Sequence, residues 1–202
     1  MLLNFFKKKQ LESYFAIVTS RNSPDMINDV LLSLKNQTIP PEYVIVIDSN
    51  STFKKQEVLK DLQKEWTSLY IITNSDSGND LGRSVKNWNK ALNLVKELNL
   101  KKTDFHMIAT DDTIYEINYA EKLLSYLAKN QHIGIISGNY DDEEYFIPHG
   151  CGRLVRNSFF EKSGLNYPEK MGNESAILCM AMQNGYTYEV LSKARLEHAR
   201  RL

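Results

Sequence analysis

Hydrophobic residues in this chain form short continuous runs that alternate with longer amphipathic stretches. The runs are rich in β-prone residues and lack the polar alternation of a half-exposed strand, so each is expected to be buried on both faces. Five strands are predicted: Tyr14–Val18, Tyr43–Ile47, Leu69–Thr73, Phe105–Ala109 and Ile133–Ser137. The pattern favours an α/β fold with a mostly parallel central sheet flanked by helices on both faces.

The stretches between these strands carry hydrophobic residues at helical spacing. Ser23–Asp25 supplies an N-cap, a first-turn proline and a first-turn carboxylate, and Pro40–Pro41 prevents the helix that follows from continuing. Later helices are predicted near Lys54–Trp66, after the loop Asn74–Gly82, over Ile117–Lys129, and over Asn173–Asn184 with Gly185 as C-cap. A strand-like stretch Tyr186–Leu191 and a basic tail end the chain.

The length of 202 residues fits one domain. The sequence contains no internal repeat, no low-complexity tract and no long Gly/Ser/Pro linker. We therefore expect a flexible segment over residues 1–12 and a single domain over residues 13–202.

Charge and composition exclude several functional classes. The 25 Lys and Arg residues balance the 25 Asp and Glu residues, so no overall field attracts nucleic acid, and none is expected as a partner. No apolar run approaches the ~20 residues of a transmembrane helix. Cys151 and Cys179 follow no zinc-site spacing, which favours a reducing, cytoplasmic location. Peripheral membrane contact through the apolar and basic residues of Met1–Gln10 stays open.

Polar residues follow three of the predicted strands, as Thr19–Asn22, Asp48–Ser51 and Thr110–Asp112. In open α/β sheets the ligand lies beyond the carboxyl ends of the strands. Oxygen ligands crowded at such an edge suit Mg²⁺ or Mn²⁺, and these ions suit a diphosphate. A metal-bound nucleotide is one interpretation. The alternative is that the same residues form turns and cap helices.

Several segments, in this order, resemble family 2 glycosyltransferases of the GT-A fold. Ala16–Asn22 and Val44–Thr52 resemble the first two strands with their polar ends, Gly82–Asn87 the start of the third helix, and Met107–Asp112 the strand with the metal-binding acidic motif. Arg156–Gly164 and Asn173–Gly185 resemble the acceptor-side region. The resemblance implies a nucleotide-binding half (13–112) and an acceptor-side half (113–202), with a smaller lid region in the C-terminal third.

The resemblance also implies roles for donor-site residues. Asp48 would read the base or ribose, with Thr19 and Ser20 lining the same pocket. Lys86 would face the diphosphate near the positive end of a helix, and a solvated lysine on an exposed face is the alternative. Asp111 would hold Mn²⁺ or Mg²⁺.

Two further residues are assigned by the same resemblance. Glu174 would be the general base, and a first-turn carboxylate favoured by the helix dipole is the alternative. His198 would complete the metal site, unless it lies in a frayed basic tail. The sequence departs from the family pattern at Ala109 and Asn173, where acidic residues are common, and at Glu174, where aspartate is usual.

The implied function is a metal-dependent inverting glycosyltransferase. It would move a sugar from a nucleotide diphosphate donor, with a UDP-sugar favoured, to a hydroxyl of a glycan, lipid-linked or polysaccharide acceptor. The alternative is a catalytically degenerate nucleotide-sugar-binding module, suggested by Ala109, Asn173 and the short C-terminus. A nucleotidyltransferase is a weaker alternative, because no Gly-rich basic loop follows the first strand.

Overall fold

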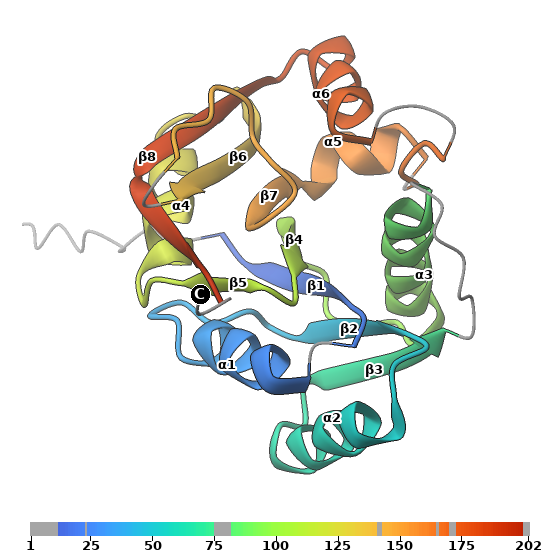
Figure 1. Ribbon diagram of the computed structural model, residues 1–202. Coiled ribbons are helices and arrows are strands. Elements are labelled where there is room, and N and C mark those ends of the chain that lie inside the picture. The colour runs from blue at the N-terminus through green and yellow to red at the C-terminus, as the bar shows by residue number, and fades with distance from the viewer. Residues whose placement is uncertain are drawn as a thin grey trace, which may run out of the picture.

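Strands and helices alternate along most of the chain (Figure 1). The computed structural model describes residues 12–22, 24–74, 82–140, 143–164, 166–169 and 173–199, and of residues 24, 25, 53–55, 173 and 174 it describes the backbone alone. The elements are β1 (Tyr14–Ser20), α1 (Pro24–Lys35), β2 (Val44–Ser49), α2 (Phe53–Glu65), β3 (Leu69–Asn74), α3 (Arg83–Glu97), β4 (Phe105–Thr110), β5 (Thr113–Tyr115), α4 (Tyr119–Leu127), β6 (Ile133–Tyr140), β7 (Arg153–Arg156), α5 (Asn157–Lys162), α6 (Asn173–Gln183) and β8 (Thr187–His198).

The strands of the described residues form one 8-stranded sheet in the order β3-β2-β1-β4-β7-β6-β8-β5. β1 pairs in parallel with β2 and β4, and β2 pairs in parallel with β3. β6 also pairs in parallel with β8, whereas β7 runs antiparallel to both β4 and β6 and β5 runs antiparallel to β8. The sheet is therefore mostly parallel, which confirms the predicted α/β class.

The hydrophobic core lies in two layers, because successive side chains of a strand point to opposite faces. Ala16 and Val18 of β1 pack in one layer with α1 and α4. Phe15 and Ile17 pack in the other with α3, α5 and α6. Burying each aliphatic side chain contributes about 1.5–3 kcal/mol, so helices on both faces are needed to bury the uninterrupted apolar strands.

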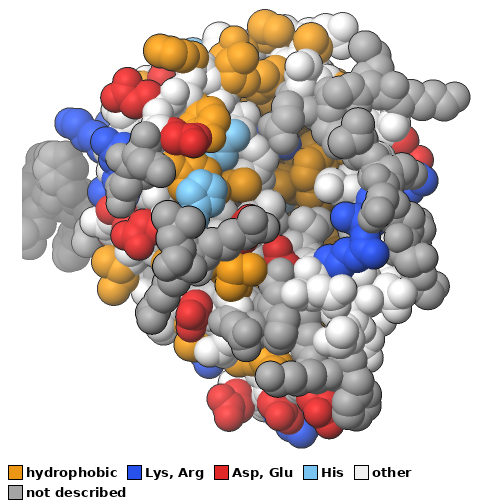
Figure 2. Space-filling model, viewed as in Figure 1, with side chains coloured by type: hydrophobic (Ala, Val, Ile, Leu, Met, Phe, Trp, Pro, Cys, Tyr) orange, Lys and Arg blue, Asp and Glu red, His pale blue; other side chains and the backbone are white. Residues whose placement is uncertain are grey.

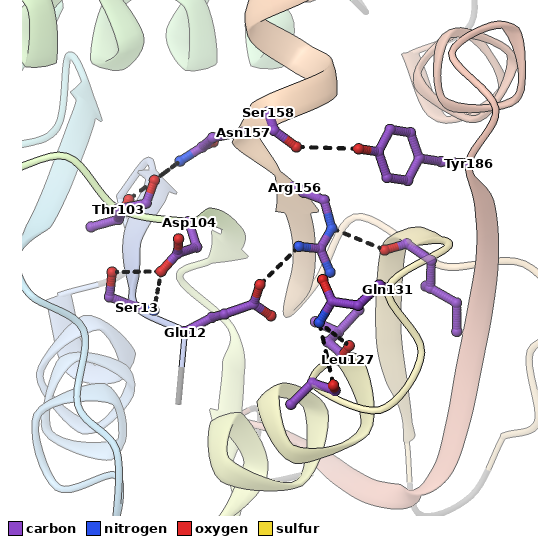
Figure 3. A network of polar contacts seen from close by, with 12 residues as sticks. Glu12, Ser13, Thr103, Asp104, Leu127, Gln131, Arg156, Asn157, Ser158 and Tyr186 are labelled. Atoms are coloured by element: carbon purple, nitrogen blue, oxygen red, sulfur yellow. Dashed lines mark hydrogen bonds and ion pairs between the residues drawn. The ribbon is translucent and has the colours of Figure 1, made fainter. Parts of the chain in front are cut away.

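Polar contacts join the chain at the amino ends of β1 and β4 (Figure 3). Asp104, just before β4, accepts hydrogen bonds from the backbone and hydroxyl of Ser13 at 2.7 and 3.1 Å. Arg156 forms an ion pair with Glu12 at 2.9 Å and donates to the Ile133 carbonyl at 3.2 Å. These contacts fix the end of the sheet opposite the polar strand ends.

The structure adds elements that the hydrophobic pattern does not predict. β7 begins and ends in arginine, and both arginines are buried, so the strand does not resemble an apolar run. The interpretation of Arg195–His198 as part of a frayed tail is wrong. β8 continues to His198 because Thr113–Tyr115 pairs with Leu196–His198.

Gly138 lies where β6 packs closely against β8 and α4. A Cβ atom there would overlap the Ala194 carbonyl oxygen and lie 2.6 Å from Tyr119 Cε2. Tyr119 is fully buried and cannot move aside. We expect Gly138→Ala to lower the free energy of unfolding by about 2 kcal/mol, measured by urea denaturation.

Gly185→Asn is the control for this prediction. Gly185 has φ +79, no atom lies within 4 Å of the position that a Cβ would take there, and asparagine tolerates this backbone region. Its midpoint should stay close to that of the wild type. An equal loss in the free energy of unfolding in the two variants would contradict the steric explanation.

Candidate functional site

The carboxyl ends of β1, β2 and β4 meet at one edge of the sheet. Ser20, the last residue of β1, lies beside Asp48 in the parallel register with β2. On its other side, the Ser20 hydroxyl donates to Asp111 Oδ2 at 2.5 Å, and the Arg21 N–H donates to the same oxygen at 2.9 Å. Asp48 and Asp111 therefore flank the end of β1, as the predicted site requires.

Asp48 is fully buried near the carboxyl end of β2, where a turn begins. Its carboxylate accepts hydrogen bonds from the hydroxyl of Ser51 and from the Ser51 N–H, the latter at 3.3 Å. Ser51 Oγ in turn accepts the N–H of Asn22 at 2.9 Å, which joins the loops after β1 and β2. The turn anticipated as the alternative for Asp48 is thus present. A carboxylate offers about four acceptor positions, so a turn and a ligand contact are compatible.

The first turns of α3 lie against the ends of β2 and β3. Asn87 donates to Ser49 Oγ at 2.8 Å and accepts from Asn74 Nδ2 at 3.0 Å. Lys90 Nζ donates to Asn74 Oδ1 at 2.7 Å. Lys86, one residue before Asn87, is half-buried. Sequence reasoning missed this amide network. The signal in the sequence that could have predicted this network is the occurrence of asparagines on the buried face of an amphipathic helix.

His198 lies beside the acidic motif. It pairs with Thr113 across β5 and β8, and the Ala199 N–H donates to the Asp112 carbonyl at 2.7 Å. The Asp112 carboxylate accepts the Thr110 hydroxyl at 2.7 Å. The fold therefore returns the C-terminal histidine to the motif that carries Asp111.

Within the described ranges, no three His, Cys, Asp or Glu side chains form a group that could hold a metal ion. Mg²⁺ and similar ions are often held by one or two carboxylates together with substrate phosphates and water. Asp111 and Asp112, which follow β4, offer carboxylate oxygens of that kind. The residues fit a divalent ion that binds together with a diphosphate.

The Tyr140 stack, formed by Tyr140, Tyr145, His149 and His198, lies next to this motif. Tyr140 stacks on His198 with ring centroids 4.0 Å apart and an interplanar angle of 9°, and on His149 at 5.3 Å. Burial, with a smaller contribution from the Arg153 charge, lowers the pKa of His149 to about 4, against a hydrogen bond to the Gly138 carbonyl. His149 is therefore neutral at pH 7.

Arg153 is a second feature that the sequence did not reveal. It is fully buried on β7, and its guanidinium carbon lies 5.9 Å from the Trp88 ring centroid. Lys and Arg are seldom fully buried, and a pattern of hydrophobic positions gives no signal for such a residue.

Glu174 lies in the first turn of α6. Its side chain, like that of Asn173, falls outside the described part of the structure. The proposed general-base role is therefore carried by sequence position alone.

Figure 2 shows a hollow in this face of the molecule. Histidine side chains lie on one side, over the end of β8, and Lys and Arg side chains lie on the other, beside α3. Among the helices described, none has the length and apolar character needed to cross a membrane.

The model of glycosyl transferase family 2 matches residues 15–183. The chain belongs to glycosyl transferase family 2, as the sequence resemblance indicated. The central curled sheet with its helices is the GT-A-like fold expected of that family. A search of curated proteins found no match.

Two solved structures illustrate the likeness. The mannosyltransferase PcManGT from Pyrobaculum calidifontis, in complex with GDP-Man and Mn²⁺, aligns with a TM-score of 0.76 at 15% identity over 95% of this chain and 58% of that chain. TarS from S. aureus, in complex with UDP-GlcNAc, aligns with a TM-score of 0.70 at 16% identity over 94% of this chain and 59% of that chain. At these identities the likeness establishes the fold. The chain spans less than two thirds of the length of either relative.

Proposed function

We propose that the protein transfers a sugar from a nucleotide diphosphate donor to a hydroxyl acceptor. The observation that carries this proposal is the meeting of Asp48 and Asp111 on either side of Ser20 at the carboxyl edge of the sheet. Family membership supports it. So do the nucleotide sugars in the complexes of PcManGT and TarS, which contain GDP-Man and UDP-GlcNAc.

Each donor-site residue has a role in this proposal. Asp48 accepts donor groups of the base or ribose, and Thr19 and Ser20 line the same pocket. Lys86, near the amino end of α3, attracts the diphosphate, because that end carries a partial positive charge. Asp111 and His198 would hold Mn²⁺ or Mg²⁺, and a bound divalent ion supplies neutralisation of diphosphate charge.

The chemistry proposed is an inverting displacement. The acceptor hydroxyl oxygen bonds to the anomeric carbon as the bond from that carbon to the diphosphate breaks. Glu174 takes the hydroxyl proton, and Lys86 stabilises the negative charge on the leaving nucleoside diphosphate. The acceptor in this proposal is a glycan or lipid-linked hydroxyl at a cytoplasmic location, in keeping with the free thiols of Cys151 and Cys179.

A thermal-shift panel tests donor binding. UDP-sugars and GDP-sugars are compared at equal concentration, each with Mn²⁺ and with EDTA. One nucleotide class should raise the melting temperature of the protein with Mn²⁺, because a ligand that binds the native state stabilises that state. The increase should be much smaller with EDTA. No shift with any nucleotide sugar would contradict the proposal. Stabilisation by nucleoside triphosphates with release of pyrophosphate would instead favour a nucleotidyltransferase.

Glu174→Gln separates an enzyme from a binding module. We expect donor hydrolysis or transfer with Mn²⁺ to fall about 100-fold, while donor affinity stays within about twofold, because loss of a general base affects proton transfer and not binding. Glu57→Gln, an exposed substitution on α2, is the matched control. Donor binding without turnover in the wild type would identify the chain as the binding module that Ala109 and Asn173 suggest.

A further inference from the structure

A cavity of about 450 Å³ lies far from the candidate donor site. Its lining includes Phe15, the second residue of β1, and Tyr43, which directly precedes β2. Ser20 and Asp48 lie at the opposite ends of these strands. A strand rises about 3.3 Å per residue, so Phe15 and Ser20 are roughly 16 Å apart along β1. The cavity is therefore separate from the edge where Asp48 and Asp111 meet.

The inner wall of the cavity is aromatic and aliphatic. Phe15 and Tyr43 stack with ring centroids 4.8 Å apart and an interplanar angle of 18°. Leu92 and Val95 of α3 and the following Leu100 also line the cavity. Small-molecule sites typically have volumes of roughly 300–1,000 Å³ with apolar walls and a few polar groups. A flat apolar group of one or two rings suits this wall.

The rim carries more positive than negative charge. Lys96, Lys101 and Lys102 line the cavity, against one carboxylate, Glu161. Lys101 forms an ion pair with Glu42 at 2.7 Å. Lys96 and Lys102 make neither a hydrogen bond nor an ion pair through their side chains within the described residues. These two ammonium groups are available to a ligand.

The carboxyl end of α3 lies at the same rim, and its carbonyl groups would compete for the lysines. Backbone N–H groups already bind several of them. Leu98 donates to Leu94, Asn99 to Lys96 and Leu100 to Val95, at 2.9, 3.2 and 3.0 Å. Because these carbonyls are capped, their attraction for the lysine side chains is reduced.

Side chains of α5 and of the loop before β4 give the cavity a polar edge. Asn157 and Thr103 both line it, and Asn157 Nδ2 donates to the Thr103 carbonyl at 2.9 Å (Figure 3). This bond fixes the asparagine side chain. The cavity therefore combines a rigid apolar wall, a fixed amide and the ammonium groups of Lys96 and Lys102.

We propose that this cavity is a binding site for a small anionic amphiphile, a molecule with a flat apolar body and one sulfonate, carboxylate or phosphate group. The rings would lie against Phe15 and Tyr43, and the anionic group would contact Lys96 and Lys102. Binding at this cavity would be a property in addition to sugar transfer, and it does not depend on the proposed function.

The probe for this site is 1-anilinonaphthalene-8-sulfonate, which has an aromatic body and one anionic group. Its fluorescence should rise on titration with the folded protein at a stoichiometry of one. The double variant Lys96→Gln/Lys102→Gln should bind it about tenfold more weakly, because two charge-assisted contacts are lost. Lys60→Gln/Lys129→Gln removes two lysines elsewhere and should bind it as the wild type does.

Two further measurements locate the probe. The uncharged N-phenyl-1-naphthylamine should bind the wild type and the Lys96/Lys102 variant equally, because it lacks the anionic group. Leu92→Trp should fill the cavity and abolish binding of both probes, provided that circular dichroism shows a folded protein. Equal sulfonate binding by both lysine double variants would overturn the proposal. Displacement of the probe by UDP with Mn²⁺ would also overturn it, because the probe would then lie in the donor site.

Discussion

Asp111→Asn should abolish Mn²⁺-dependent donor binding while leaving the fold intact. Asp111 Oδ2 accepts hydrogen bonds from Ser20 and Arg21, and an asparagine side-chain oxygen can accept the same two bonds. The substitution therefore removes the negative charge and keeps the contacts between β1 and β4. Loss of a charged ligand to a divalent ion should cost about 4 kcal/mol, or roughly 10³-fold in kcat/KM.

Isothermal titration with a UDP-sugar or GDP-sugar, with Mn²⁺ and with EDTA, measures the binding effect, and donor hydrolysis measures turnover. Asp111→Ala should lose donor binding equally and should also unfold at lower temperature, because the Ser20 hydroxyl and Arg21 N–H lose their acceptor. Asp29→Asn, an exposed substitution on α1, is the charge-matched control. If Asp111→Asn binds the donor in Mn²⁺ as tightly as the wild type does, Asp111 is not part of the proposed metal site.

The first half of the fold could be predicted because its strands are buried on both faces. An uninterrupted run such as Val44–Ile47 has few alternatives to a central parallel strand. The second half was harder to predict. β7 carries Arg153 and Arg156, and β8 alternates charged and apolar residues through Lys193–Glu197, so long-range pairing and not composition decides their structure.

The site could be predicted in part for the same reason. Parallel strands place their carboxyl ends together, so the meeting of Asp48 with Asp111 followed from strand order. The hydrogen-bond partners at the site could not be predicted from strand order. The link from Ser20 to Asp111 and the contact of Ala199 with Asp112 join residues about 90 positions apart in sequence, and no local pattern records them.

Acid should destabilise the protein through His106. This residue is fully buried on β4, and burial lowers its pKa from 6.5 to about 4, against a hydrogen bond to Asn157. Asn157 Nδ2 donates to the Thr103 carbonyl, so its Oδ1 faces His106 and accepts the Nδ1 proton at 2.6 Å. His106 Nε2 then accepts the hydroxyl of Tyr167 at 2.6 Å. The neutral imidazole satisfies both partners, and a second ring proton would disturb this network.

The sign of the pH effect follows from the two pKa values. Below pH 6.5 the unfolded chain binds a proton at this histidine, whereas the native state does not until about pH 4. The free energy of unfolding should therefore fall as the pH drops from 6.5 to 4, by on the order of 3 kcal/mol for this group. His149, whose pKa is lowered in the same direction, adds to the fall.

Urea denaturation at pH 7.0, 5.5 and 4.5 measures this dependence. His106→Phe should be less stable than the wild type at pH 7, because Tyr167 and Asn157 lose their partner, but should lose less stability on acidification. His132→Gln, an exposed substitution, should keep the wild-type dependence. An equally steep loss in His106→Phe, or an NMR titration of the His106 ring with a midpoint near 6.5, would contradict the assignment. Either result would mean that the acid sensitivity arises from other groups.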